Sequence, residues 1–290
     1  MRPPSLARSL LVAAGCLAFA LGPAAAVVRV SGSTTVNPVV VEAAALLTEE
    51  LGMTIRVDTL GGSSGGIAAL GDGRADVAMS SRPLQPSDQE KYPATRFQPL
   101  PIGLDALALV VSRDVWEGGI RALSKDEVRS IYEGELTNWR ALGGPDRRIV
   151  FFNKEPGRGT WEVFASWLYG DSESAPLVSL PEVGSNEEAR SKVASAPGAI
   201  SQLSAAWADG ETTFALAIRD DDGHPVVPSV ENVRSHTYPL SRTLLLITNG
   251  RPGSEVGVLL DFLRSRRGQQ IVERHGFLSI ADIDQEVDAP

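Results

Sequence analysis

Three segments of this sequence combine glycine with serine or threonine directly before a stretch of helical type. They are SGSTTVNP at 31–38, TLGGSSGGIAAL at 59–70 and KEPGRGTWEVF at 154–164. The first N–H groups of a helix have no partner within it, and hydroxyl side chains add further donors, so such turns suit an anion. Glycine also lets the backbone approach a ligand closely. The pattern therefore indicates an anion site built where three loops meet.

Each turn taken alone also fits a simpler interpretation. Ser33, Thr34 and Ser63 could only cap helices, because hydroxyl side chains are preferred at helix starts. Arg82 and Arg158 follow or lie within such segments and add positive charge. Three turns together with two cations favour an anion site over three separate caps.

The turn at 61–66 also matches the pattern of a hydrolase nucleophile. GGSSG and GSSGG both satisfy G-x-S-x-G, with Ser63 or Ser64 as the nucleophile. No oxyanion segment of the H-G-G-G type is present, and the three histidines lack a recognisable context. The sequence contains neither a phosphate-binding P-loop pattern nor Cys/His spacing suited to a metal. A serine hydrolase stays an alternative, but we expect no catalytic residue, cofactor or metal.

The first 26 residues have the features of a secretory signal. Arg2 and Arg8 precede an apolar run that is too short to span a bilayer, and small residues lead to Ala26. We expect cleavage after Ala26 and a periplasmic or otherwise extracytoplasmic protein. Lipid attachment at Cys16 is the less favoured alternative. Because Cys16 is the only cysteine, no disulfide can form within the chain.

The composition is that of an acidic globular chain. It has 290 residues, of which 43% are hydrophobic and 22% charged, enough for one large domain or two lobes. A net charge of −9 excludes a general attraction to nucleic acid. An anion must therefore bind through local geometry, against the overall field of the protein.

Short apolar strands alternate with helical segments, which predicts an α/β fold with mainly parallel sheets. The first strands are expected at 27–32 and 54–62, and a later one at 147–155. Two long apolar runs, at 102–112 and 239–250, could be interior strands of one sheet or crossings into a second lobe and back.

Five segments, in order along the chain, resemble the periplasmic phosphate-binding proteins of ABC importers. They are SGSTTVNPVVVEAAALL, GGSSGGIAALGDGRADVAMSSRPL, LSKDEVRSIYEGELTNWRALGG, GRGTWEVF and YPLSRTLLLITNG. The resemblance implies a two-lobed, type II-like periplasmic-binding-protein fold, each lobe a mainly parallel sheet with flanking helices. With the two apolar runs as crossover hinge strands, lobe I covers 27–105 and 236–290, lobe II covers 106–235, and 1–26 is the signal peptide.

The same resemblance implies a protein that binds its ligand and catalyses no reaction. Such a protein captures phosphate, or a related tetrahedral oxyanion, between its lobes and delivers it to an ABC permease in the inner membrane. We expect a monomer whose partners are the anion and the permease. A drifted member that acts as a sensor or surface protein is a further alternative. The family's ligand-binding positions fall here on Ser33, Thr34, Ser63, Ser64, Ser81, Arg82 and the turn with Arg158, Gly159 and Thr160.

Charged residues depart from the family's pattern at this site. Arg158 replaces a serine, and Lys154 stands where the family often has arginine. Some members have an aspartate at the position of Ser81, where it accepts the proton of monohydrogen phosphate. Asp105 could supply that carboxylate, or it could orient Arg82. We expect Arg82 and Arg158 to grip the anion from opposite sides.

The segment IYEGELTNW at 131–139 is distinctive but is not expected to touch the ligand. Tyr132 and Trp139 carry large apolar surfaces, whose burial stabilises a fold by roughly 1.5–3 kcal/mol or more per side chain. We therefore predict that both belong to the core.

Overall fold

A computed structural model describes residues 27–280 of the protein. The expected signal peptide at 1–26 and Cys16 lie outside the described residues, so secretion and its cleavage point stay predictions. Within residues 27–280, no helix combines the length and the apolar character needed to cross a bilayer.

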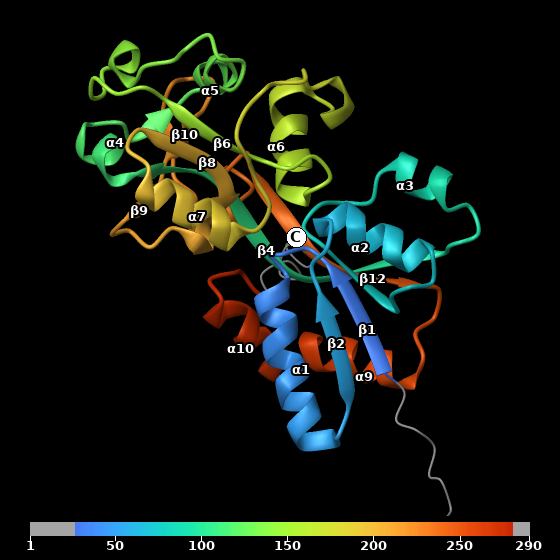
Figure 1. The fold of residues 1–290 in the computed structure, drawn as a ribbon. Coiled ribbons are helices and arrows are strands. Elements are labelled where there is room, and N and C mark those ends of the chain that lie inside the picture. The colour runs from blue at the N-terminus through green and yellow to red at the C-terminus, as the bar shows by residue number, and fades with distance from the viewer. Residues whose placement is uncertain (1–26, 281–290) are drawn as a thin grey trace, which may run out of the picture.

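The chain forms two α/β groups that meet at two long central strands (Figure 1). β4 (Phe97–Ser112) pairs along its first half with β12 (Ser241–Asn249) and along its second half with β8 and β9. All of these pairings are antiparallel. The two apolar runs of the sequence are therefore interior strands that also connect the two groups.

The first group contains the N-terminal segments and the end of the chain. Its helix α1 buries Val39, Val40 and Leu47 on one face and ends at Gly52, whose φ of 67° is in the left-handed region. The elements of this group, besides β12, are β1 (Val27–Gly32), α1 (Asn37–Leu51), β2 (Thr54–Asp58), α2 (Gly62–Gly71), β3 (Val77–Ser80), α3 (Pro86–Lys91), α9 (Ser254–Arg264) and α10 (Arg266–Arg274).

The second group is formed by the middle of the chain. Its helix α5 begins with a capping box, in which the Ser124 side chain accepts from the Glu127 N–H and Glu127 bonds back to the Ser124 N–H. The elements are α4 (Arg113–Glu117), β5 (Ala122–Leu123), α5 (Lys125–Tyr132), η1 (Trp139–Leu142), β6 (Val150–Lys154), α6 (Gly159–Tyr169), η2 (Ser172–Ser174), β7 (Glu182–Val183), α7 (Asn186–Ser195), β8 (Ala199–Ser204), η3 (Ala205–Trp207), β9 (Thr213–Ala215), β10 (Ala217–Arg219), β11 (Pro225–Val226) and α8 (Val230–Arg234).

The main sheet is mixed, with the strand order β2-β1-β3-β12-β4-β8-β6-β7, and β9 also pairs with β4. Strands β1, β2 and β3 are parallel, as are β6, β7 and β8. The predicted α/β class is confirmed. A separate small sheet of β5, β10 and β11 contains the antiparallel pair β10–β11, whereas in the main sheet every pair that involves neither β4 nor β12 is parallel. The antiparallel pairs of the main sheet occur where β4 and β12 join the groups, because these two strands run in opposite directions through the centre.

Each group has its own hydrophobic core. One core includes Val30, Val39 and Met79, and the other includes Tyr132 and Trp139. We refer to them as the first core and the second core. The predicted core positions of Tyr132 and Trp139 are confirmed, since the side chains are 1% and 0% exposed. The lobe boundaries at 105/106 and 235/236 stay a prediction.

Candidate anion-binding site

A small cavity lies where the N-terminal ends of α1, α2 and α6 converge between the two cores. The carboxyl ends of β3 and β6 lie there too, one from each group, because the parallel strands within a group deliver their carboxyl ends to one edge and these two edges face each other. The residues that line the cavity are Ser33, Thr34, Thr35, Gly62, Ser63, Ser81, Lys154, Arg158, Gly159, Thr160 and Gly184. The three glycine-rich turns of the sequence therefore meet, as the sequence pattern predicts.

Glycine is required at two of these positions by the close approach of the chain. A Cβ atom at Gly159 would lie 2.4 Å from Ser63 Oγ and 2.9 Å from Ser81 Oγ. At Gly62, where φ is +61°, a Cβ would lie 2.6 Å from the Cδ of Arg158. Side chains at these positions would push α2 and α6 apart, so the glycines allow both helix starts to face one small space.

The space suits one small dehydrated ion. It leaves about 10 Å³ for the centre of a water-sized sphere, which is about the minimum that one buried water needs. The oxygens of a tetrahedral oxyanion are close to water in size, and their centres lie one bond length from the central atom. The space therefore admits nothing larger than a small ion without its hydration water, and a nucleotide or a sugar phosphate is too large.

The hydroxyl groups of the cavity form hydrogen bonds with one another and with neighbouring backbone N–H groups. Ser33 Oγ accepts from the N–H groups of Thr35 and Val36 and lies 3.0 Å from Ser81 Oγ. Ser63 Oγ accepts from the Ser81 N–H at 3.1 Å. Ser33 thus fixes the turn that leads into α1, and Ser63 fixes the chain after β3. The rotatable hydroxyl hydrogens of both serines remain able to turn toward a ligand.

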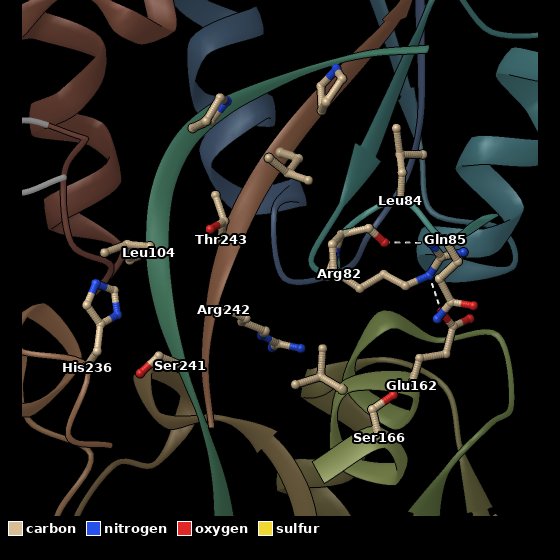
Figure 2. A pocket seen from close by; sticks show the side chains of 15 residues that line it. Arg82, Leu84, Gln85, Leu104, Glu162, Ser166, His236, Ser241, Arg242 and Thr243 are labelled. Carbon is tan, nitrogen blue, oxygen red and sulfur yellow. Dashed lines mark hydrogen bonds and ion pairs between the residues drawn. The ribbon is translucent and has the colours of Figure 1, made fainter. Parts of the chain in front are cut away.

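A buried ion pair stands directly behind the hydroxyl groups. Arg242 on β12 holds Asp105 on β4 with Nε–Oδ2 and Nη2–Oδ2 distances of 2.8 and 2.7 Å, and both residues are nearly inaccessible to solvent. The same guanidinium donates to Thr160 Oγ1 at 2.8 Å and to Thr35 Oγ1 at 3.3 Å. Figure 2 shows Arg242 extending from β12 toward α6. Arg242 does not line the cavity itself, but it donates hydrogen bonds to two threonines that do.

The carboxylate of Asp105 does not line the cavity. Its Oδ1 accepts from Ser204 Oγ at 2.6 Å, and its Oδ2 is held by Arg242. Burial raises the pKa of Asp105, and the adjacent Arg242 guanidinium opposes this by stabilising the carboxylate. The structure thus pairs Asp105 with Arg242 instead of Arg82, and it places no aspartate or glutamate in the cavity lining among residues 27–280.

Lys154, at the end of β6, brings an amine into the cavity wall. The residue is 1% exposed, and its Nζ donates to the carbonyls of Ser185 at 2.6 Å and Gly184 at 3.2 Å. Burial, together with the charges of Arg158 and Arg242, lowers the pKa of Lys154 to about 7. The amine is thus poised between its charged and neutral forms near neutral pH.

Arg158 borders the cavity from the N-terminus of α6. Its Nε and Nη2 donate to Glu155 at 2.9 and 2.6 Å, and its Nη1 reaches the Thr59 carbonyl beside α2 at 3.4 Å. The side chain is 16% exposed. It therefore spans from the second group to the first at the edge of the site.

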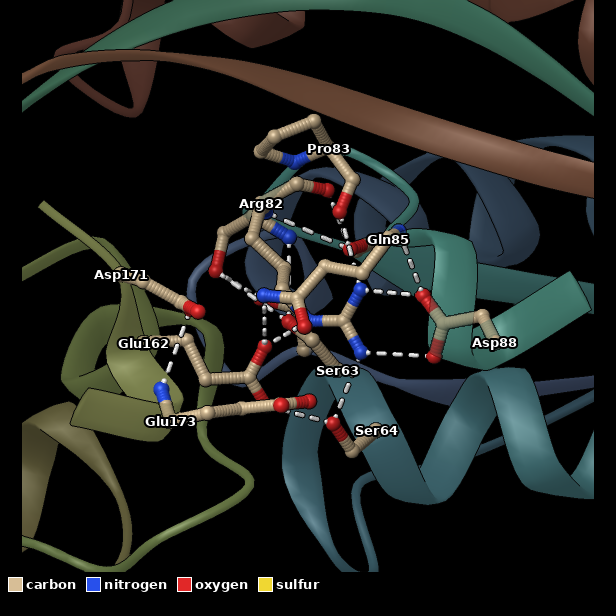
Figure 3. A network of polar contacts seen from close by, with 12 residues as sticks. Ser63, Ser64, Arg82, Pro83, Gln85, Asp88, Glu162, Asp171 and Glu173 are labelled. Atoms are coloured by element: carbon tan, nitrogen blue, oxygen red, sulfur yellow. Dashed lines mark hydrogen bonds and ion pairs between the residues drawn. The ribbon is translucent and has the colours of Figure 1, made fainter. Parts of the chain in front are cut away.

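Arg82 and Ser64 lie outside the cavity, in a neighbouring network (Figure 3). Arg82 donates to both carboxylate oxygens of Asp88, at 2.6 and 3.0 Å, and forms an ion pair with Glu162. Ser64 Oγ donates to Glu162 at 2.6 Å and accepts from Arg82 at 2.9 Å. Arg82, expected to grip the anion opposite Arg158, is therefore paired with two carboxylates in this structure and is not among the residues that line the cavity.

This network joins the two groups of the fold. Glu162 belongs to α6, whereas Arg82, Ser64 and Gln85 lie on the side of the first core. Burial raises the pKa of Glu162, and the Arg82 charge opposes this. The network thus links α6 to α2 and to the segment that contains Arg82 and Gln85.

We predict that Glu162→Gln weakens anion binding by roughly 5- to 30-fold, since losing about 1–2 kcal/mol from the contacts between the two groups has that effect. Isothermal titration calorimetry with phosphate measures the change. Glu90→Gln, on the exposed side of α3, removes the same charge without this contact and should leave affinity unaltered. Equal affinities of Glu162→Gln and wild type would show that the network does not contribute to anion binding.

Sequence reasoning missed two contributors to the site. Thr35 follows the two positions that were selected, and Arg242 lies in the apolar run at 239–250. A single arginine near the start of an otherwise uncharged buried strand is itself a signal, because an isolated charge in such a strand needs a partner. That partner is Asp105, but the sequence alone left Asp105 open to Arg82 as well.

Among the described residues, no histidine contacts either serine of the hydrolase alternative, and the carboxylate beside Ser64 is engaged in an ion pair with Arg82. The partners of Ser63 Oγ are groups of Ser81, and those of Ser64 Oγ are Glu162 and Arg82. No histidine is among the lining residues of the cavity in the described part of the chain. The arrangement offers donors and positive charge to an anion, which is the chemistry of binding.

Comparisons with known proteins agree with this geometry. A family model described as a PBP superfamily domain matches residues 20–267. The chain is 29% identical over 262 residues to the phosphate-binding protein PstS of Bacillus subtilis (strain 168), covering 90% of this chain and 83% of that protein. It is 28% identical over 260 residues to PstS of Borreliella burgdorferi, covering 88% and 90%.

Solved structures give the same result for the three-dimensional fold. A proposed phosphate ABC transporter substrate-binding protein from Clostridium perfringens, solved with bound phosphate, has a TM-score of 0.77 and 27% identity, covering 88% of this chain and 99% of that one. An ABC-type phosphate transport receptor from Vibrio cholerae has a TM-score of 0.68 and 25% identity, covering 87% and 99%.

Proposed function

Since the chain belongs to the PBP superfamily, we propose that this protein is an extracytoplasmic solute-binding protein that captures phosphate, or a related tetrahedral oxyanion, and delivers it to an ABC permease. The bound ion is released without chemical change. The alternative of a serine hydrolase has no support from the relatives, and the partners of Ser63 and Ser64 do not favour it.

One observation carries this proposal. The cavity admits no ligand larger than a small dehydrated ion, and its wall combines helix N-termini, hydroxyls and cations, with no carboxylate among the lining residues that the structure describes. Oriented N–H groups and hydroxyls can replace the water of a dianion, and the buried cations offset its charge. Lys154 and Arg158 supply charge at the wall, and Arg242 supplies it from behind.

The proposed mechanism is closure around the ion. We propose that 27–105 with 236–290 and 106–235 move as two lobes about β4 and β12. Ser33 and Ser63 would then contact the ion from one lobe, and Thr160 from the other. A ligand that contacts both lobes favours the closed state, because its interactions are complete only there. The permease would receive the ion when the lobes separate.

Calorimetric titration of the purified protein with phosphate tests the proposal. We expect one phosphate per protein molecule, with a thermal unfolding midpoint that rises with phosphate concentration. At a free phosphate concentration of 100 times Kd, the free energy of unfolding should increase by about 2.7 kcal/mol. Absence of binding to phosphate, arsenate and sulfate at millimolar concentration would overturn it.

A further inference from the structure

The buried amine of Lys154 has an arrangement that changes its role with its protonation state. Two of its tetrahedral positions face the carbonyls of Gly184 and Ser185, and a third is the bond to its own carbon. Lys154 lines the cavity, so the fourth position is available to a ligand there. In the ammonium form this position holds an N–H donor, whereas in the neutral amine it holds a lone pair that accepts.

The charged groups around Lys154 keep both forms accessible. Arg158 and Arg242 disfavour the ammonium form, and Glu155 and Glu188 favour it. Burial adds to the effect of the two guanidiniums and lowers the pKa of Lys154 to about 7. An arginine at this position could not provide the neutral form, because its guanidinium stays charged.

We infer that Lys154 is the residue that distinguishes phosphate from sulfate, by accepting the proton of monohydrogen phosphate in its neutral form. This inference rests on the proposed function and deepens it. A carboxylate is the usual physical means of rejecting an anion that has no proton. Here the neutral amine of Lys154 accepts the proton instead, because Asp105 is bound by Arg242 and Ser204 and does not line the cavity.

The proton balance of the two ions differs in consequence. Monohydrogen phosphate brings its own hydrogen, which it donates to the Lys154 lone pair, so no proton is taken from solvent. Sulfate has no hydrogen, and its oxygens would face the lone pair. Sulfate therefore binds only to the ammonium form, and above neutral pH each bound sulfate must take up one proton from solvent.

The serine and threonine hydroxyls cannot make this distinction. A hydroxyl rotates to donate to a sulfate oxygen as readily as it accepts from a phosphate hydrogen. Glu162 is also unavailable, because Arg82 and Ser64 hold it in the neighbouring network. Among the described residues that line the cavity, Lys154 is thus the group whose acceptor and donor forms interconvert by protonation near neutral pH.

Calorimetric titrations of the wild-type protein with phosphate and sulfate at pH 7, 8 and 9 test the inference. Each affinity is expressed for the dianion, and two buffers of different ionisation enthalpy count the protons exchanged. We expect the sulfate affinity to fall about fivefold from pH 7 to pH 8 and about tenfold from pH 8 to pH 9, where uptake approaches one proton. Phosphate affinity should change by less than about threefold from pH 8 to pH 9. Arsenate should behave like phosphate, and selenate like sulfate.

Lys154→Arg supplies the matched control, since it keeps the positive charge at every pH used. In this variant the ratio of phosphate to sulfate affinity should not depend on pH. If wild-type phosphate and sulfate affinities fall in parallel with pH, the role of Lys154 is wrong and the proposed function stands. If the wild-type protein binds none of the four anions, the proposed function itself fails. The wild-type measurement decides these outcomes even if the variant does not fold.

Discussion

Arg242→Met should lower the phosphate affinity of the protein by at least about 100-fold. The guanidinium is the partner of the buried Asp105 and orients Thr160 and Thr35 at the cavity wall. Breaking a buried ion pair by removing one partner lowers the free energy of unfolding by about 3–5 kcal/mol, because the remaining charge is left without compensation. That charge would also repel the bound dianion. Titration calorimetry with phosphate on the folded variant measures the loss.

A double variant separates the two effects of this substitution. Arg242→Met with Asp105→Asn removes both charges, so it should recover much of the stability that the single variant loses in thermal unfolding. We expect its phosphate affinity to stay well below that of wild type, because the positive field at the site is not restored. Wild-type affinity in the single variant would contradict the assignment of Arg242 to the site.

Trp139→Ala should lower the free energy of unfolding by about 3–5 kcal/mol, as large-to-small changes in a core do. Trp139 is 0% exposed in the second core, and its Nε1 donates to the Gly198 carbonyl at 2.9 Å. The substitution leaves a cavity and a carbonyl without its partner. Because Trp139 does not line the anion site, the folded fraction should keep a phosphate affinity close to that of wild type.

Chemical denaturation and calorimetry on the same samples test both halves of this prediction. Trp207→Ala is a suitable comparison, since Trp207 is only partly buried and packs at the edge of the second group. It should cost less stability than Trp139→Ala. A Trp139→Ala protein as stable as wild type but unable to bind phosphate would refute the structural role of this residue.

Local sequence pattern was sufficient for the α/β class and for the three helix starts that face the cavity. Strand periodicity, helix starts and glycine-rich turns depend on residues close together in the chain, so 31–38, 59–70 and 154–164 could be recognised without the fold. Tyr132 and Trp139 could be assigned to a core for a related reason, since burying apolar side chains of that size stabilises the fold strongly.

Which charged residues pair with one another was decided by the tertiary structure. Arg82 and Arg242 both follow buried strands or lie within them, and either could have paired with Asp105 on sequence grounds. The antiparallel register of β4 and β12 places Arg242 directly opposite Asp105, 137 residues away in the chain, while Asp88 and Glu162 hold Arg82. The register of two strands is set along their whole length, so the local sequence around Arg242 does not predict its partner.

The sequence by itself therefore determined which backbone turns can bind an anion, because a helix start with glycine and hydroxyl groups is a local property. Only the tertiary structure decided which cations lie at or behind the cavity and how strongly burial acts on them. The charge state of Lys154 depends on burial and on Arg158, Arg242, Glu155 and Glu188, which come from separate elements. Electrostatic energies follow distance and desolvation in space, and neither can be calculated from positions along the chain.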